Sequence, residues 1–171
     1  EGMGALRKIV EQHAEFDTRA VMVFPAGTFP QVPINDKKMY PFYAKCVELG
    51  IPIFCCAGVP GPRLKFAPQH VELIDEVMYD FPELTFVTRH GCEPWTALAV
   101  KLMLKWPGLH YMTSAFAPKH YPKDIINYAN GINGQYGFLL GQVEGNPVVT
   151  QSVKDRLAEL VWDGRPPPSS R

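Results

Sequence analysis

Short apolar runs alternate with amphipathic segments along this chain, and this alternation constrains the fold more than any single motif. Each run is about 4–6 residues long and apolar on both faces, as expected of buried parallel strands. The runs fall at 20–24, 51–56, 84–87, 109–112 and 136–140. Segments with helical spacing separate them, at 36–49, 68–79, 93–105 and 121–129. The repeat of roughly 25–33 residues predicts successive βα units and an α/β fold.

Five βα units running in one direction leave two architectures open, a doubly wound open sheet and a (β/α)8 barrel. The turn after the first run, at 25–30, lacks the GxGxxG pattern of a Rossmann-like nucleotide site, which weighs against the open sheet. We therefore expect a barrel. Because such barrels take about 250 residues, a chain of 171 residues would hold only part of one, over residues 1–141.

The remaining residues, 142–171, are expected to form a divergent C-terminal segment. The sequence GING at 131–134 would end a helix early, and the stretch at 141–150 shows no clear period. An amphipathic stretch at 153–162 predicts one short helix. The final RPPPSSR cannot hold regular structure, so we expect a disordered Pro/Ser tail.

Charge and cysteine content argue against several classes of partner. The formal net charge is zero and Lys and Arg form no stripe, so neither nucleic acid nor an anionic membrane is expected as the main partner. No apolar run approaches the ~18 residues that span a bilayer. Four cysteines, two of them adjacent, predict reduced thiols and a cytoplasmic protein. The expected partner is a small-molecule substrate, and a homo-oligomer is left open.

Several short segments occur in a fixed order between residues 20 and 129. They read PIND (33–36), YPFYAKCVELGIP (40–52), AG (57–58), DFPEL (80–84), RHGCEPW (89–95) and YMTSA (111–115). In this combination the chain resembles the amidohydrolase-2 (amidohydrolase-related) family, and within it the relatives of carboxymuconate-semialdehyde decarboxylase. The resemblance implies a TIM-like barrel, of which these segments would be roughly the fourth to eighth strands. It also implies a hydrolase or decarboxylase that uses a divalent metal, with zinc as the first expectation.

Much of that family's metal site is missing from the sequence. The family carries a His-x-His pair on its first strand, and this chain has none. Cys56 stands where a further His ligand usually follows a strand, and the segment at 137–142 has no counterpart of the Asp that ends the eighth strand. Two explanations stay open. Either the N-terminal half is absent and the chain after Asn130 is divergent or read in a shifted frame, or the site is modified, with Cys56 replacing a histidine.

His90 is the one member of the family's catalytic set that the chain retains, and it is the expected catalytic residue. It follows an apolar strand at the end that faces the active site of a barrel, where an imidazole can shuttle protons near neutral pH or bind a metal. The alternative is a histidine hydrogen-bonded into a loop. Cys56 is the other candidate metal ligand, because a thiolate binds a soft metal. Strand alternation allows only one of Cys55 and Cys56 to point into the barrel.

Three further residues near His90 are candidates for substrate binding. Arg89 could clamp a carboxylate with its guanidinium, although strand alternation would send it away from His90 toward an outer salt bridge. Trp95 could form an apolar substrate wall or pack in the core, and Ser114 ends the next strand at the same rim. The other histidines show no metal-ligand spacing and are expected to be structural or on the surface: His13, His70, His110 and His120.

Together these residues indicate an enzyme in which His90 is the general acid/base on a small organic substrate, carboxylated or cyclic. The reaction would be hydrolysis of a C–N or C–O bond or a non-oxidative decarboxylation, assisted by a bound divalent ion. Two alternatives stay open: a non-catalytic, metal-free barrel that binds a ligand or partner, and a truncated fragment.

Overall fold

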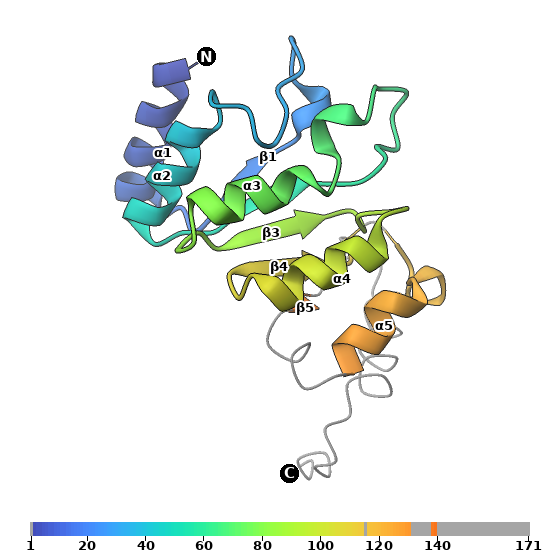
Figure 1. The fold of residues 1–171 in the computed structure, drawn as a ribbon. Coiled ribbons are helices and arrows are strands. Elements are labelled where there is room, and N and C mark those ends of the chain that lie inside the picture. Colours follow the sequence, from blue (N-terminus) through green and yellow to red (C-terminus); the bar gives the residue numbers. More distant parts are fainter. Residues whose placement is uncertain (1, 115, 131–137, 140–171) are drawn as a thin grey trace, which may run out of the picture.

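The computed structural model describes residues 2–114, 116–130 and 138–139. Helices and strands alternate along them: α1 (Gly2–Phe16), β1 (Val21–Val23), α2 (Tyr40–Leu49), β2 (Ile53–Cys56), α3 (Leu73–Asp80), β3 (Phe86–Arg89), α4 (Thr96–Lys105), β4 (Leu109–Met112), α5 (Lys123–Asn130) and β5 (Phe138–Leu139). The loops after β1, β2 and β4 contain the short 3₁₀ helices η1 (Pro25–Gly27), η2 (Ala67–Gln69) and η3 (Pro118–His120). The alternation predicted from the sequence is confirmed (Figure 1).

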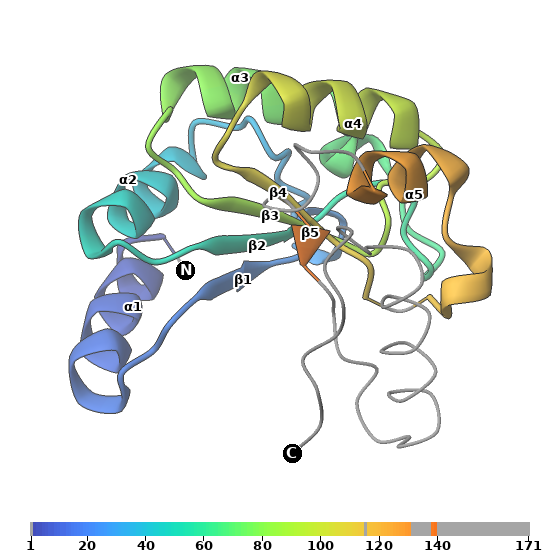
Figure 2. The same cartoon turned by 90° about the horizontal axis from the view of Figure 1, so that it is seen from below.

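The strands form one parallel sheet whose order in space is their order in the sequence, β1-β2-β3-β4-β5. A doubly wound sheet reverses its order at a switch point, and this sheet does not. Right-handed crossovers between strands taken in sequence place the connecting helices on one face. Figure 2 shows α3, α4 and α5 together over one face of the sheet. The described residues are therefore an arc of a (β/α) barrel, as expected.

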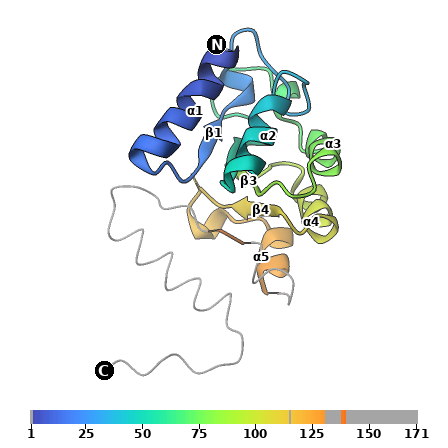
Figure 3. The ribbon, with the colours of Figure 1, turned by 90° about the vertical axis from the view of Figure 1, so that its left-hand side faces the viewer.

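The face of the sheet under the helices is the hydrophobic core. Side chains alternate between the two faces of a strand, and Ile53, Cys55, Phe86 and Tyr111 point toward the helices as members of the core. The helical residues packed with them include Tyr43 and Cys46 on α2, Ile74, Val77 and Met78 on α3, Leu102 and Met103 on α4, and Ile125 on α5. Burying each large apolar side chain stabilises the fold by about 1.5–3 kcal/mol. Helix α1 lies beside α2 at the end of this row (Figure 3).

The opposite face, called the inner face below, carries the strand residues between those of the core. It is defined here by Met22, Phe54, Cys56, Val87, Arg89, His110 and Met112. The register places Met22, Phe54 and Val87 side by side, and it places Cys56 beside Arg89. Cys56 and Val87 are buried and yet do not belong to the core cluster under the helices. The inner face corresponds to the interior of a barrel.

Several helices begin later than the sequence pattern predicts, and two of them have a simple local cause. The helix expected from residue 36 begins at Tyr40, because the Asp36 carboxylate accepts the N–H of Lys38 (2.9 Å) and closes a turn ahead of the helix. The last described helix begins at Lys123 instead of 121. The Pro122 carbonyl, which precedes it, accepts its first N–H bonds.

The helix expected at 68–79 is divided into η2 and α3, because His70 between them has an extended backbone (φ −64°, ψ 135°). The division leaves Gln69 buried between two loops. Its Nε2 donates to the Gly58 carbonyl (2.8 Å), and its Oε1 accepts the Ala26 N–H (3.4 Å). One buried amide therefore joins the loops that follow β1 and β2.

Some expectations fall outside the described residues. Of the strand expected at 136–140, the structure describes Phe138–Leu139, which pairs with β4. The boundary at 141/142, the short helix at 153–162 and the Pro/Ser tail lie outside the described part and stay predictions. Among the residues that are described, no helix is long and apolar enough to cross a membrane.

Gly58, which follows β2, approaches the turn ahead of α4 closely. Its φ is +97°, and a Cβ at this position would meet backbone atoms of Cys92 and Glu93 at 2.8 Å. We expect Gly58→Ala to lower the free energy of unfolding by roughly 1–3 kcal/mol, because it adds strain at positive φ and a backbone clash. Urea denaturation followed by circular dichroism measures the change. Gly61→Ala in the same loop is the matched control, since a Cβ there meets nothing within 4 Å. Equal stabilities of the two variants would contradict the close approach.

Candidate functional site

The carboxyl ends of three neighbouring strands bring most of the predicted site residues to one edge of the sheet. Cys56 is the last residue of β2 and Arg89 the last of β3. His90 follows Arg89 directly, and Ser114 lies two positions beyond the end of β4. In parallel α/β folds this edge is where ligands bind, because the loops that leave it are free to vary.

A tight turn holds His90 at this edge. His90, Gly91 and Cys92 all have positive φ, at 65°, 89° and 55°. This turn is the reason why the helix expected from residue 93 begins only at Thr96. The Tyr111 hydroxyl donates to the Gly91 carbonyl (2.7 Å) and ties the turn to β4. Left-handed backbone at residues other than glycine costs about 1–3 kcal/mol each and is found at functional sites.

Ser114 is the main hydrogen-bonding partner of His90. Its Oγ lies 3.1 Å from His90 Nδ1 and accepts the His90 backbone N–H at 3.3 Å. Its carbonyl oxygen lies 3.5 Å from the same Nδ1. A carbonyl only accepts, so these contacts favour the tautomer with the proton on Nδ1. In that tautomer Nε2 keeps its lone pair. Sequence analysis placed both residues at one rim, and the structure brings them into contact.

The pKa of His90 is lowered from its ordinary value. Partial burial is the largest cause, the nearby Arg89 charge acts in the same direction, and the Ser114 hydrogen bond opposes both. A lowered pKa keeps the imidazole neutral at physiological pH, which is the form that accepts a proton.

Alternation along β3 places Arg89 on the inner face, whereas counting alternation from His90 predicted the outer side. We expected it to point away from His90 into an outer salt bridge. The register instead sets it beside Cys56 on the inner face, and it forms no ion pair with any described residue; its guanidinium contacts the Met22 thioether. The alternation argument is wrong here because His90 has a left-handed backbone and has already left the strand.

Cys56 is buried on the inner face, whereas Cys55 belongs to the core under the helices. Burial raises the pKa of the Cys56 thiol, and the Arg89 charge opposes this only in part. The described residues contain no group of three or more His, Cys, Asp or Glu side chains that could hold a metal ion. A catalytic zinc site takes three protein ligands. Cys56 and His90 are therefore too few donors to fit such a site, and the role of each as a ligand stays a prediction.

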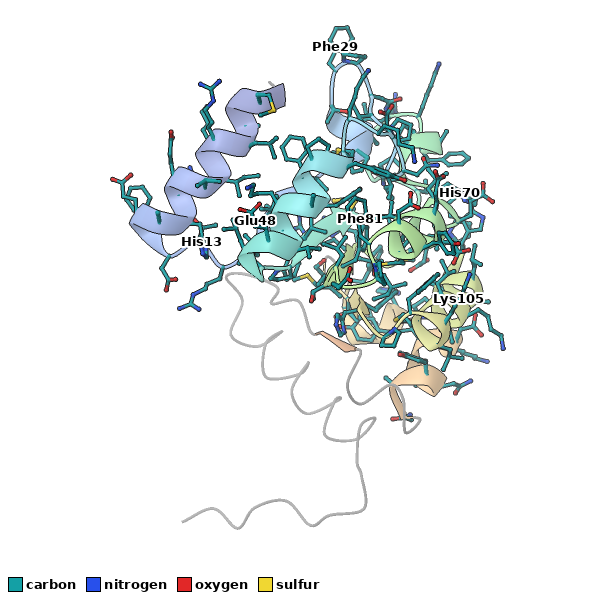
Figure 4. The ribbon with its side chains drawn as sticks, turned by 60° about the vertical axis from the view of Figure 1, so that its left-hand side comes forward. His13, Phe29, Glu48, His70, Phe81 and Lys105 are labelled. Atoms are coloured by element: carbon teal, nitrogen blue, oxygen red, sulfur yellow. The ribbon has the colours of Figure 1, made fainter. Side chains whose placement is uncertain are left out.

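Trp95 directly precedes α4 and packs against the core. The centroid of its ring is 3.9 Å from that of His70 and 5.4 Å from that of Phe66, both in the segment between β2 and α3. Its role as a substrate wall is untested by these contacts. Figure 4 shows His70 on the opposite side of the molecule from His13. The Nδ1 of His13 lies 2.8 Å from the Thr18 carbonyl oxygen.

The sequence pattern did not indicate two features near this edge. His110 lies half-buried on the inner face beside Val87, and burial lowers its pKa. Strand alternation could have placed His110 on the inner face, because Leu109 and Tyr111 on either side of it face the core. The bond from Tyr111 to Gly91 spans 20 residues. No local sequence pattern indicates it.

Removing the positive charge of Arg89 tests the electrostatics of the site. We expect Arg89→Gln to raise the pKa of His90 toward its ordinary value, because the guanidinium charge opposes protonation of the imidazole. An NMR titration of the His90 ring protons measures the shift. Arg89→Lys keeps the charge and should keep the pKa low, and Arg63→Gln, on an exposed loop, should leave it unchanged. An unaltered His90 pKa in Arg89→Gln would contradict the proximity of the Arg89 charge to the His90 imidazole.

The sign of the pH dependence of stability follows from the lowered pKa of His90. A histidine whose pKa is lowered by folding binds more protons when unfolded, so its contribution to stability is present above the unfolded pKa of about 6.5 and is lost as the pH falls below it. Arg89→Gln should weaken this dependence.

Comparisons with solved structures agree with the fold. The uncharacterized TIM-barrel protein Bb4693 of Bordetella bronchiseptica is 24% identical with a TM-score of 0.70, over 93% of this chain and 63% of that one. The 4-oxalomesaconate hydratase LigJ of Rhodopseudomonas palustris is 18% identical with a TM-score of 0.51, over 93% of this chain and 57% of that one. The chain thus spans about three fifths of the length of these neighbours.

No curated protein sequence matches the chain significantly. The sequence profile of an amidohydrolase family, amidohydrolase-2, matches residues 5–132 of the chain. This match covers all the described elements from β1 to α5, including the turn that carries His90. The chain belongs to the amidohydrolase family.

Proposed function

We propose that the protein is a hydrolase-type enzyme in which His90 is the general acid/base. The observation that carries this proposal is the contact between His90 Nδ1 and Ser114, at 3.1 Å from the hydroxyl oxygen. It occupies one ring nitrogen and leaves Nε2 as the base, at the edge of the sheet where ligands bind in this fold. Family membership supports the same class of chemistry.

In the proposed mechanism Nε2 of neutral His90 takes a proton from water or from the substrate. The imidazolium that forms keeps its Nδ1–H bonded to Ser114, so the ring does not rotate as the charge appears. It then returns the proton from Nε2 to the leaving group or to the carbon that has lost its substituent. Proton transfer by a positioned side chain of this kind contributes about 10²–10⁴-fold to the rate.

The finer reaction type is also part of the proposal. Hydrolysis of a C–N or C–O bond and non-oxidative decarboxylation both use a base that becomes an acid. The LigJ neighbour is named as a hydratase, an enzyme whose reaction also moves a proton between water and substrate. The resemblance to the decarboxylase branch supports the second reaction. A divalent ion, zinc first, would polarise the substrate or activate water when bound. The described donors do not complete a site for it, so no step is assigned to the ion.

Replacing His90 tests the proposal directly. We expect His90→Asn to lower kcat by about 10²–10⁴-fold, because Asn cannot carry a proton between water and substrate. Turnover of a panel of small amides, esters and carboxylic acids can be followed by proton NMR and by release of CO2. His120→Asn, at an exposed position in η3, is the matched control and should keep full activity. Unchanged kcat in a folded His90→Asn variant would remove His90 from the mechanism.

Ser114 is expected to act as a positioning residue. Ser114→Ala removes the hydroxyl that holds Nδ1 and the backbone N–H of His90, and kcat should fall roughly tenfold, the effect of one hydrogen bond. Ser114→Thr keeps a hydroxyl and should restore most of the rate. The pH dependence of kcat is the second readout, because a loosened imidazole titrates differently while a purely structural defect leaves that profile in place.

A ligand-binding barrel without catalysis is the second candidate. The observation in its favour is that the described residues contain no group of three or more His, Cys, Asp or Glu side chains that could hold a metal ion. Elemental analysis of the purified 171-residue chain separates the two candidates. About one zinc, manganese or iron per folded chain would exclude the metal-free barrel, and Cys56→Ser and His90→Asn would then identify the ligands.

A further inference from the structure

Positive and negative charge are separated along the segment that joins β2 to β3. Residues 59–71, in the loop after β2, contain Arg63 and Lys65 and no Asp or Glu. Residues 72–83, which form α3 and its ends, contain no Lys or Arg and five acidic residues: Glu72, Asp75, Glu76, Asp80 and Glu83. Lys37 and Lys105, from other elements, pair with three of these, so α3 keeps an excess of negative charge. A basic loop therefore adjoins one end of an acidic helix (Figure 1).

The same segment exposes several large apolar side chains. Four of the ten that are exposed in the described part belong to it: Val59, Leu64, Phe66 and Tyr79. Tyr79 is 74% exposed, and Glu76 lies three residues before it on the same face of α3. Arg63 and Lys65 are exposed on either side of Leu64. Each half of the segment thus combines apolar contact area with charge of one sign, and the two halves have opposite signs.

We propose that residues 59–83 form an interface between two copies of this chain, in which the basic loop of each copy docks on the acidic surface of α3 of the other. A two-fold axis between the adjoining halves makes both contacts at once, which is how a closed dimer forms. Leu64 and Phe66 of one copy then meet Tyr79 of the other, inside a rim of paired charges. A second copy matches both signs of charge by itself, and a formal net charge of zero leaves no overall repulsion between copies.

Sedimentation equilibrium of the full 171-residue chain tests this interface. We expect a monomer–dimer equilibrium that weakens as salt rises from about 0.05 to 0.5 M, because salt screens exposed charges. Arg63→Glu combined with Lys65→Glu should raise the dissociation constant of the dimer by about tenfold or more, because like charges then face each other. The matched control is Arg7→Glu combined with Lys8→Glu on the exposed side of α1, which should leave it unchanged. Circular dichroism shows that each variant is folded.

A charge swap identifies the two surfaces that meet. Glu72→Lys combined with Glu83→Lys should also weaken the dimer, because the basic loop then faces added positive charge. An equal mixture of this variant with the Arg63→Glu, Lys65→Glu variant should form a heterodimer, since every contact again joins opposite signs.

Three results would overturn the interface. They are a wild-type chain that stays monomeric at every concentration, a dimer that both reversed variants keep unchanged, and a mixture of the reversed variants that stays monomeric. A dimer that persists in both variants would place the contact elsewhere, for example at the open edge of β1. The inference is independent of the proposed function, so His90→Asn should dimerise as the wild-type chain does.

Discussion

The right-handed crossover between parallel strands is the constraint on which the rest of this structure depends. With the strands taken in sequence, each crossover sets its helix on the same face of the sheet. That face becomes the core, where Phe86 and Tyr111 meet the helices. The other face is left to Cys56, Arg89 and their neighbours. All the carboxyl ends of the strands then point toward one edge, so that residues far apart in sequence converge there.

The turn at 90–92 links this scaffold to the candidate chemistry. Its left-handed backbone ends β3 and reorients His90 relative to Arg89. Tyr111 holds the turn from one side through Gly91, and Gly58 leaves room for it on the other. Strain of this kind persists where the surrounding contacts outweigh it. Here those contacts come from β2 and β4, which flank β3 in the sheet.

The electrostatics of the edge depend on how the charges are distributed. Some exposed cations in the described part have carboxylate partners, as Lys37 and Lys105 do. Arg89 has a thioether and two titratable neighbours, Cys56 and His90, whose protonation it affects. Its charge favours neutral His90, the form that a base requires.

The sequence by itself determined the order of strands and helices, because apolar runs and helical spacing are local properties. It also indicated the family, and it placed His90 and Ser114 after neighbouring strands, where the structure brings them into contact. It misplaced helix starts at Asp36 and Glu93, where a side-chain turn and left-handed backbone compete with the helix.

Only the tertiary structure decided which groups meet. The pairing of Cys56 with Arg89, the bond from His90 to Ser114 and the brace from Tyr111 to Gly91 all depend on strand register. Register is set by burial of one face of the sheet against the helices. That burial is a property of the folded chain as a whole, and no local pattern contains it.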